Sequence, residues 1–169
     1  MDGGSTPLFI AAEEGHEAVV RALIELGADI NKARDDGATP LFIAAPNDHE
    51  AVVRALIELG ADINKSEKNG VTPLIVGALL GHEAILQALI EAGADINKAL
   101  LDGGETPLFI AAHQGHEAAV RALIELGADV SKAENNGVTP LSVAAQEGHT
   151  AIVQILRDAV LVQMRNLSL

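Results

Sequence analysis

The amino-acid sequence predicts an all-α solenoid of five stacked helix–turn–helix units. The dipeptide Thr-Pro begins at positions 6, 39, 72, 106 and 139, so it recurs at intervals of 33, 33, 34 and 33 residues. A period of this length is typical of repeat proteins, in which each unit packs against its neighbours. The apolar side chains are almost all aliphatic, with three Phe and no Trp or Tyr. We predict one domain over residues 1–169, with repeats at about 1–34, 35–67, 68–100, 101–134 and 135–169.

The first helix of each unit is predicted to begin at the Thr-Pro dipeptide. In the first unit, the hydroxyl of Thr6 can cap a helix, and Pro7 suits the first helical position, where a missing N–H is not a loss. Gly15 can adopt the left-handed conformation that ends a helix. We therefore expect a helix over residues 7–14 and a counterpart in each of the other units.

A second helix and a projecting, hairpin-like tip complete each unit. In the first unit we expect this helix over residues 16–26, closed by Gly27, and then a tip rich in Asp and Gly at 35–37, a composition typical of tight turns. Helices this short are marginal alone, so their stability must come from neighbouring units. Stacking requires an apolar face, and apolar residues recur at helical spacing in the first unit: Leu8, Ala11, Ala12, Val19, Leu23 and Leu26.

The repeated residues resemble a known family. Thr-Pro-Leu-Phe-Ile-Ala-Ala occurs at 6–12, 39–45 and 106–112, and Arg-Ala-Leu-Ile-Glu-Leu-Gly-Ala-Asp at 21–29, 54–62 and 121–129. Together with the Gly-His pairs that separate the two helices, these segments resemble the ankyrin repeat over residues 2–157. The resemblance implies L-shaped units in a curved array. It also implies a non-catalytic interaction role, with partners bound on the concave surface of tips and first helices.

Departures from the repeat pattern predict local differences in structure. Ankyrin repeats commonly have a hydrogen-bonding His after Thr-Pro-Leu, and an apolar seam is expected to replace that network at Phe9, Phe42, Ile75, Phe109 and Ser142. Pro46 cannot donate to the carbonyl of Phe42, so the first helix of the second unit should end early or bend. The segment 99–105 carries one residue more than its counterparts, which predicts a longer tip.

The two ends of the chain differ from the inner units. The sequence starts within the first tip, which indicates a segment of a longer array. At the other end, Val160 replaces the glycine that closes the second helix elsewhere. We expect the last helix to extend past residue 160 and to cover the end of the stack.

Composition narrows the possible partners and environments. The chain has no Cys, so disulfides and thiolate metal sites are excluded. Its net charge of −13 disfavours nucleic acids and anionic membranes, which require a positive surface. The first residues lack the basic and apolar parts of a signal peptide, and no apolar run approaches the roughly 20 residues that span a bilayer. We therefore predict an intracellular, cytoplasmic protein without cofactors.

Recurring histidines and carboxylates are interpreted as structural. One histidine precedes each second helix, but equivalent positions of stacked helices lie about 8–10 Å apart, too far to share a metal ion. We expect these histidines to help start the second helix. Glutamates and arginines at i,i+4 spacing, as in Glu17, Arg21 and Glu25, are typical of a solvated outer face. No catalytic arrangement is found, so we predict that the chain is not an enzyme.

The positions that vary within the constant frame are the best candidates for a binding site. They lie just after the paired alanines and just before each Thr-Pro. Repeat three is apolar at both places, and two leucines follow at the next tip. We predict an exposed apolar cluster that marks an interaction site, because such patches often do. The predicted partner-binding residues are Val71, Leu79, Leu80, Leu100, Leu101, Glu105 and His113.

The sequence therefore predicts a protein-binding module that uses the concave face around repeat three. The negative net charge would favour a partner with a basic face. Part of the rim of this site would be acidic: Glu13, Glu14, Asp35, Asp36, Asp102 and Glu105. The alternative is a structural spacer, or a self-associating segment of a longer array with no dedicated ligand. We expect a monomer, with residues 160–169 as the place where weak self-association would arise. An enzymatic or small-ligand role is the least supported class.

Overall fold

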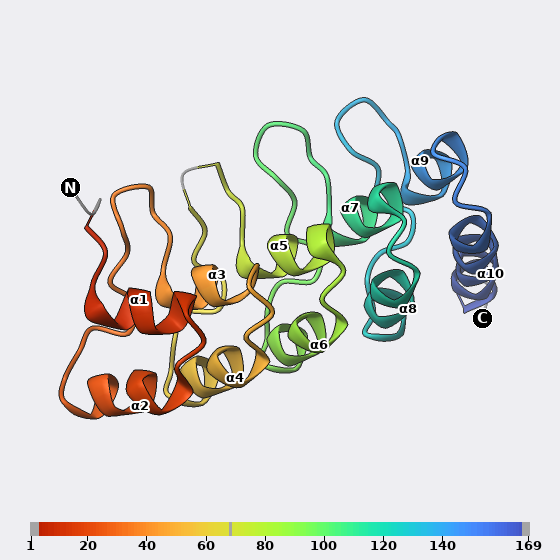
Figure 1. The fold of residues 1–169 in the computed structure, drawn as a ribbon. Coiled ribbons are helices and arrows are strands. Elements are labelled where there is room, and N and C mark those ends of the chain that lie inside the picture. The colour runs from red at the N-terminus through yellow and green to blue at the C-terminus, as the bar shows by residue number, and fades with distance from the viewer. Residues whose placement is uncertain (1–3, 68, 167–169) are drawn as a thin grey trace.

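The computed structural model describes residues 4–67 and 69–166, and in these the chain forms helix pairs stacked side by side (Figure 1). The first helices form one row: α1 (Pro7–Glu13), α3 (Pro40–Ala44), α5 (Pro73–Leu80), α7 (Pro107–Gln114) and α9 (Pro140–Gln146). The second helices form another: α2 (Glu17–Glu25), α4 (Glu50–Glu58), α6 (Glu83–Glu91), α8 (Glu117–Glu125) and α10 (Thr150–Asn166). The described residues contain no strand. The tips project from the row of first helices, so the predicted all-α solenoid is confirmed.

Threonine caps every first helix, as predicted. The Oγ1 atom of Thr6 accepts a hydrogen bond from the backbone N–H of Phe9 at 3.1 Å, and each of the other four Thr-Pro dipeptides repeats this contact. In the last repeat, Ser142 adds a reciprocal bond, because its Oγ atom accepts from the N–H of Thr139 at 2.8 Å. The apolar seam is therefore present at the buried Phe9 and Ile75, whereas Ser142 makes a capping contact instead.

The second repeat has the short first helix that Pro46 predicts. Helix α3 has five residues, against seven or eight in the other first helices. After the helix ends, Asp48 has a positive φ of 57°, and it is the one residue other than glycine with a positive φ in the described chain. Glycines take this conformation in the other repeats, for example Gly15 at 76° and Gly81 at 75°. The second repeat therefore turns between its helices with a residue poorly suited to the left-handed region.

The recurring histidines join neighbouring repeats rather than capping their own helices. Four of them, His16, His49, His82 and His116, occupy the N-cap position of a second helix, but their side chains make no cap hydrogen bond. Instead, the Nε2 atom of His116 donates to the carbonyl of Leu79 in the preceding repeat at 2.9 Å. His49, His82 and His149 make the same kind of contact with the repeat before theirs. The histidines therefore stand at the start of the second helices, as expected, and their side chains bond to the preceding repeat rather than to their own helix.

Aliphatic packing and polar ladders hold the repeats together. Of the predicted apolar face, Leu8, Ala11 and Ala12 are buried, and Val20 is buried beside them. The prediction was wrong for Val19 and Leu26, which are exposed. Along the bases of the tips, asparagine side chains accept backbone N–H groups of the next repeat. Asn31, for example, accepts from the N–H of Asp62 at 2.8 Å, and Asn64 and Asn97 repeat this bond. Each repeat boundary thus combines apolar burial with satisfied backbone groups.

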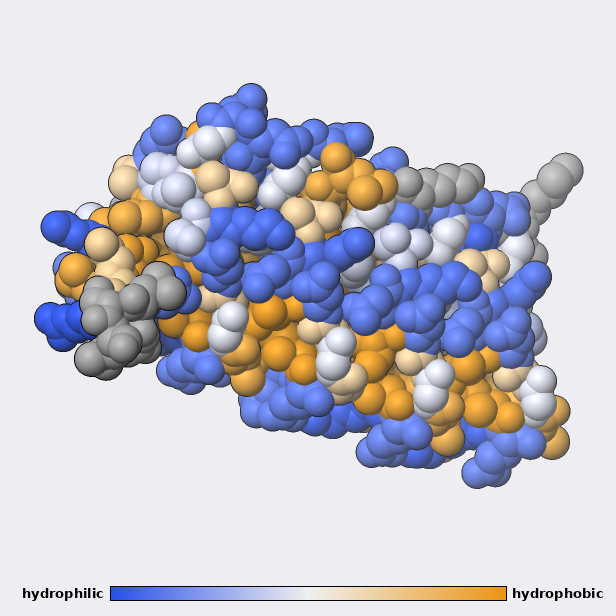
Figure 2. All heavy atoms as spheres, turned by 180° about the vertical axis from the view of Figure 1, so that it is seen from behind, coloured by the Kyte–Doolittle hydropathy of each residue, from blue (hydrophilic) through white to orange (hydrophobic). Residues whose placement is uncertain are grey.

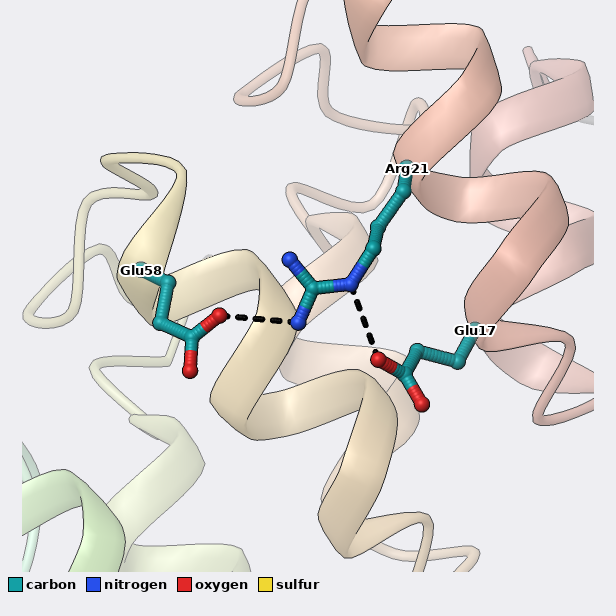
Figure 3. A network of polar contacts seen from close by, with 3 residues as sticks. All are labelled: Glu17, Arg21 and Glu58. Carbon is teal, nitrogen blue, oxygen red and sulfur yellow. Dashed lines mark hydrogen bonds and ion pairs between the residues drawn. The ribbon is translucent and has the colours of Figure 1, made fainter.

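The outer face carries the predicted i,i+4 ion pairs, with one addition. Arg21 contacts Glu17 within α2 at 2.8 Å, and its second nitrogen reaches Glu58 on α4, also at 2.8 Å (Figure 3). The arginine thus bridges two repeats instead of pairing with Glu25. Figure 2 shows the molecule from behind, where apolar side chains form a band between hydrophilic ones along the row of second helices.

The last helix is longer than the others, as predicted. Helix α10 runs over 17 residues, and Ala159 and Val160 pack against the apolar core at the end of the stack. Beyond them, Leu161 and Val162 are exposed. Only the first part of the extension therefore covers the stack, and residues 161–165 are exposed.

Candidate functional site

An apolar pocket opens on the side of the molecule that carries the tips, across repeats three to five. It encloses about 480 Å³, a size within the range of binding cavities in proteins. Three first helices, α5, α7 and α9, form its floor, and residues of three successive tips form its walls. The lining residues are Val71, Ile75, Leu79, Leu100, Glu105, Phe109, Ile110, His113, Gln114, Glu134, Val138, Val143, Gln146 and Glu147. We call this cavity the tip-face pocket.

The structure brings five of the seven predicted site residues together at this pocket. They come from a tip before α5, from the last turn of α5, from the longer tip and from α7: Val71, Leu79, Leu100, Glu105 and His113. The other two, Leu80 and Leu101, do not line it. Leu79 and Leu80 are exposed to almost the same extent, 43% and 42%, but only Leu79 faces the pocket.

Leu101 packs on the neighbouring tip instead of facing the pocket. A Cβ atom placed on Gly70 would lie 2.6 Å from Leu101 Cγ, so the leucine occupies the space that a side chain at Gly70 would need. Leu101 is still 66% exposed. Leu100 points the other way and packs against the core. The extra residue of this tip explains the difference. The N–H of Leu100 bonds to the carbonyl of Glu105, five positions ahead, whereas the corresponding bond in the other tips joins residues four positions apart.

The sequence predicted a site around repeat three, but not the residues that repeat five contributes to the pocket. Val138, Gln146 and Glu147 lie at the same variable positions in repeat five that Val71, Leu79 and Leu80 occupy in repeat three. The pattern of variable positions could therefore have identified these three residues. Glu134 and Val143 carry no such signal, since they belong to the ordinary tip and helix pattern. The described cavity is centred on repeat four, one unit later than the predicted cluster.

Acidic groups surround the apolar floor of the pocket. Glu147 lies 3.7 Å from the Nε2 atom of His113, and the ring of His113 lies 6.3 Å from that of Phe109. The backbone N–H of Asn136, followed by that of Val138, lowers the pKa of Glu134, so this side chain stays ionised at neutral pH. Of the lining residues that the structure describes, none is Lys or Arg.

Glu105 is unusual because one of its oxygen atoms is buried without a hydrogen-bond partner. Its Oε2 atom is the one such side-chain atom in the described residues. The carboxylate folds back over Gly103, where a Cβ atom would overlap it. An orphaned buried acceptor is costly unless a donor reaches it, so it needs a functional or structural explanation.

The rest of the predicted acidic rim lies elsewhere or is already paired. Asp36 bonds to Arg34 within its own tip, and Arg34 also stacks over Phe9, 5.0 Å from the ring centroid. The described residues include no group of three or more His, Asp or Glu side chains that could hold a metal ion. None of the described helices combines the length and apolar character needed to cross a membrane.

Comparisons with known proteins agree with the geometry. The family model described as ankyrin repeats (3 copies) matches residues 8–100 and again 98–165. No curated protein matches the chain. The two matched segments together cover most of the five helix pairs, with the threonine caps, the paired alanines and the glycine turns that the structure shows. The chain therefore belongs to the ankyrin-repeat family, whose members are generally protein–protein interaction modules.

Proposed function

We propose that this chain is a non-catalytic module that binds a protein partner on its tip face, with the tip-face pocket as the anchoring point. The observation that carries the proposal is the apolar pocket itself, in which the exposed side chain of Leu79 lies beside the largely buried Ile75 and Phe109. An anchor of this kind is typical of binding sites, where one buried apolar contact supplies much of the binding energy and a polar rim surrounds it.

The residues of the pocket support binding better than catalysis. Its polar groups are three glutamates, a glutamine pair and one histidine, and the histidine faces a glutamate at 3.7 Å without a hydroxyl or thiol nucleophile among the lining residues. Nucleophilic catalysis needs such a nucleophile within hydrogen-bond reach of its base. An apolar floor with a charged rim instead favours recognition of a side chain.

Leu79 and Leu80 provide a matched test of the proposed site. We expect Leu79→Asp to abolish capture of a partner, because it places a charge on the apolar floor, while Leu80→Asp leaves capture intact. The measurement is quantitative affinity capture from cell extract with the wild-type chain and both variants. Circular dichroism and thermal melting should match among the three proteins. A partner that is retained equally by both variants would show that the pocket is not the binding site.

The second candidate function is a spacer or a self-associating segment. The exposed Leu161, Val162 and Met164 at the end of α10 favour it, because they add apolar surface beyond the end of the stack. In this case the tip-face pocket would have no dedicated protein ligand.

A further inference from the structure

The charges around the tip-face pocket have one sign. Glu105, Glu134 and Glu147 come from different parts of the fold, and none of the described residues that line the pocket is Lys or Arg. His113 is the one group that can become positive there, and it already faces Glu147. Neighbouring negative charges repel one another, and together they attract a cation. The rim is therefore suited to bind a positively charged group.

The carboxylate of Glu105 points to the same chemistry. Its Oε2 atom is buried against Gly103 and accepts no hydrogen bond from the described protein, whereas Oε1 is the oxygen that a ligand in the pocket can reach. Gly103 has no side chain, and this leaves room for the carboxylate to fold back. A carboxylate oxygen forms its shortest and strongest hydrogen bonds with a charged N–H donor. The longer tip therefore holds an acceptor in place at the rim.

We propose that the tip-face pocket binds a basic segment of a partner protein, in which a bulky apolar side chain stands next to an Arg or Lys. The apolar side chain enters between Leu79 and Phe109, and the cation reaches Glu105 and Glu134. Burial of the apolar group supplies binding free energy, and the charge-assisted hydrogen bonds supply selectivity for basic segments. This inference rests on the proposed function of the pocket and adds the chemical class of the partner.

The test begins with a random linear peptide library selected on the intact chain. Peptides that bind the wild-type chain and Leu80→Asp but not Leu79→Asp are those that occupy the pocket. We expect these peptides to be enriched in Arg or Lys beside a large apolar residue. Pocket-dependent peptides that are neutral or acidic would overturn the inference and leave the proposed function standing. If no peptide distinguishes Leu79→Asp from Leu80→Asp, both fail.

A charge-matched pair of variants then tests the role of Glu105. We expect Glu105→Gln to weaken binding of the best basic peptide about tenfold in fluorescence anisotropy, because a charge-assisted bond is lost. Glu125→Gln on α8 changes the net charge equally, lies outside the pocket and should leave affinity unchanged. Equal affinity of both variants would overturn the inference.

Gly103→Ala gives an independent readout without altering any charge. The φ angle of Gly103 lies outside the positive range, so alanine fits the backbone, but its Cβ atom must displace the carboxylate of Glu105. We expect this variant to lose affinity for the basic peptide about as much as Glu105→Gln, with an unchanged melting temperature. Full affinity in Gly103→Ala would show that the folded-back carboxylate does not contact the ligand.

Discussion

At the scale of single residues, histidine and glycine act together at each repeat boundary. The ring of His116 donates to the carbonyl of Leu79 and packs on Gly81, where a Cβ atom would lie 2.8 Å from the ring. Gly15 and Gly115 receive the rings of His49 and His149 in the same way. Glycine is therefore required twice, once for its positive φ and once for the space it leaves to the next repeat.

Asp36 offers a direct test of local electrostatics in the second tip. The side-chain hydrogen bond from Arg34, followed by the backbone N–H of Ala38, lowers the pKa of Asp36 from 3.8 to about 2. We expect an NMR titration of the folded chain to show this value, and Arg34→Gln to move it back toward 3.8. Because the pKa of Asp36 is lower in the folded than in the unfolded chain, its ionised carboxylate stabilises the folded state above pH 3.8. This stabilisation is lost as the pH falls through about 2.

The control for this titration is Arg54→Gln, which removes an arginine from α4 outside the tip. It should leave the pKa of Asp36 at about 2. An ordinary value in the wild-type chain, or the same value in Arg34→Gln, would show that the arginine does not hold the carboxylate.

Some residue-level features could be read from the sequence and others could not. The threonine caps follow from local rules and are all present. The histidine bonds between repeats depend on packing of one unit on the next, so a pattern within one repeat does not reveal them. Gly77 illustrates the same limit: it replaces an alanine of the frame, and the larger Leu86 fills the space, 3.2 Å from where its Cβ would lie.

At the scale of elements, the boundary between repeats two and three is the weakest part of the row of first helices. Helix α3 ends after five residues, and its contact with α5 is smaller than that of any other neighbouring pair of first helices. Asp48 then holds a positive φ without being glycine. In a repeat array, stability is close to a sum over units and their interfaces, so a weak interface allows partial opening.

We predict that Asp48→Gly strengthens this part of the array. Glycine removes the cost of the left-handed conformation, so the variant should be more stable by about 1 kcal/mol. The lost contact with His82, at 3.5 Å and exposed, offsets little of this gain. Hydrogen exchange followed by mass spectrometry should show faster exchange in α1–α4 than in α5–α8 of the wild-type chain, and about fivefold slower exchange of α3 in the variant.

The reciprocal variant is Gly81→Ala in repeat three. It places a side chain at a φ of 75° and against the ring of His116, so it should speed up exchange in α5 and lower stability. If Asp48→Gly leaves exchange unchanged while Gly81→Ala accelerates it, the turn in repeat two is not the weak point. The early end of α3 was predictable from Pro46, and the positive φ of Asp48 follows from its place before His49, where other repeats have Gly-His.

At the scale of the whole molecule, the end of α10 is the place to test self-association. Residues 161–165 are exposed, whereas Val160 packs against the core, so a deletion should begin at residue 161. A few exposed side chains fall far short of the roughly 1,200 Å² that a stable interface buries. We expect light scattering to give a monomer for the full chain and for the chain ending at Val160, with similar melting temperatures.

Concentration-dependent dimers of the full chain that disappear on this deletion would support the self-associating alternative. Residues 167–169, which belong to the same predicted segment, lie outside the described residues. A control deletion of residues 167–169 alone separates the contribution of these residues from that of Leu161 and Val162.

The architecture could be predicted almost completely from the sequence, and the site only in part. Five copies of one local pattern specify five helix pairs, so the fold follows from repetition. The lining of the pocket depends on how each tip packs against its neighbours. The extra residue near Leu101 turns its side chain onto Gly70, and Leu80 lies one position away from the lining of the pocket. Such differences of one position arise from packing between units and are not encoded in a single repeat.

The polar contacts between repeats also join residues that are close together in the sequence. In the described residues, the side-chain hydrogen bonds that cross a repeat boundary join positions at most 37 apart. Proteins with such local contacts have low contact order and fold quickly. Each unit also presents matching upper and lower surfaces, so duplication or loss of a whole unit would preserve the interfaces. The tip-face pocket spans three successive units, and a unit inserted among them would divide it. Genetic rearrangement could thus change what the molecule binds without changing how it folds.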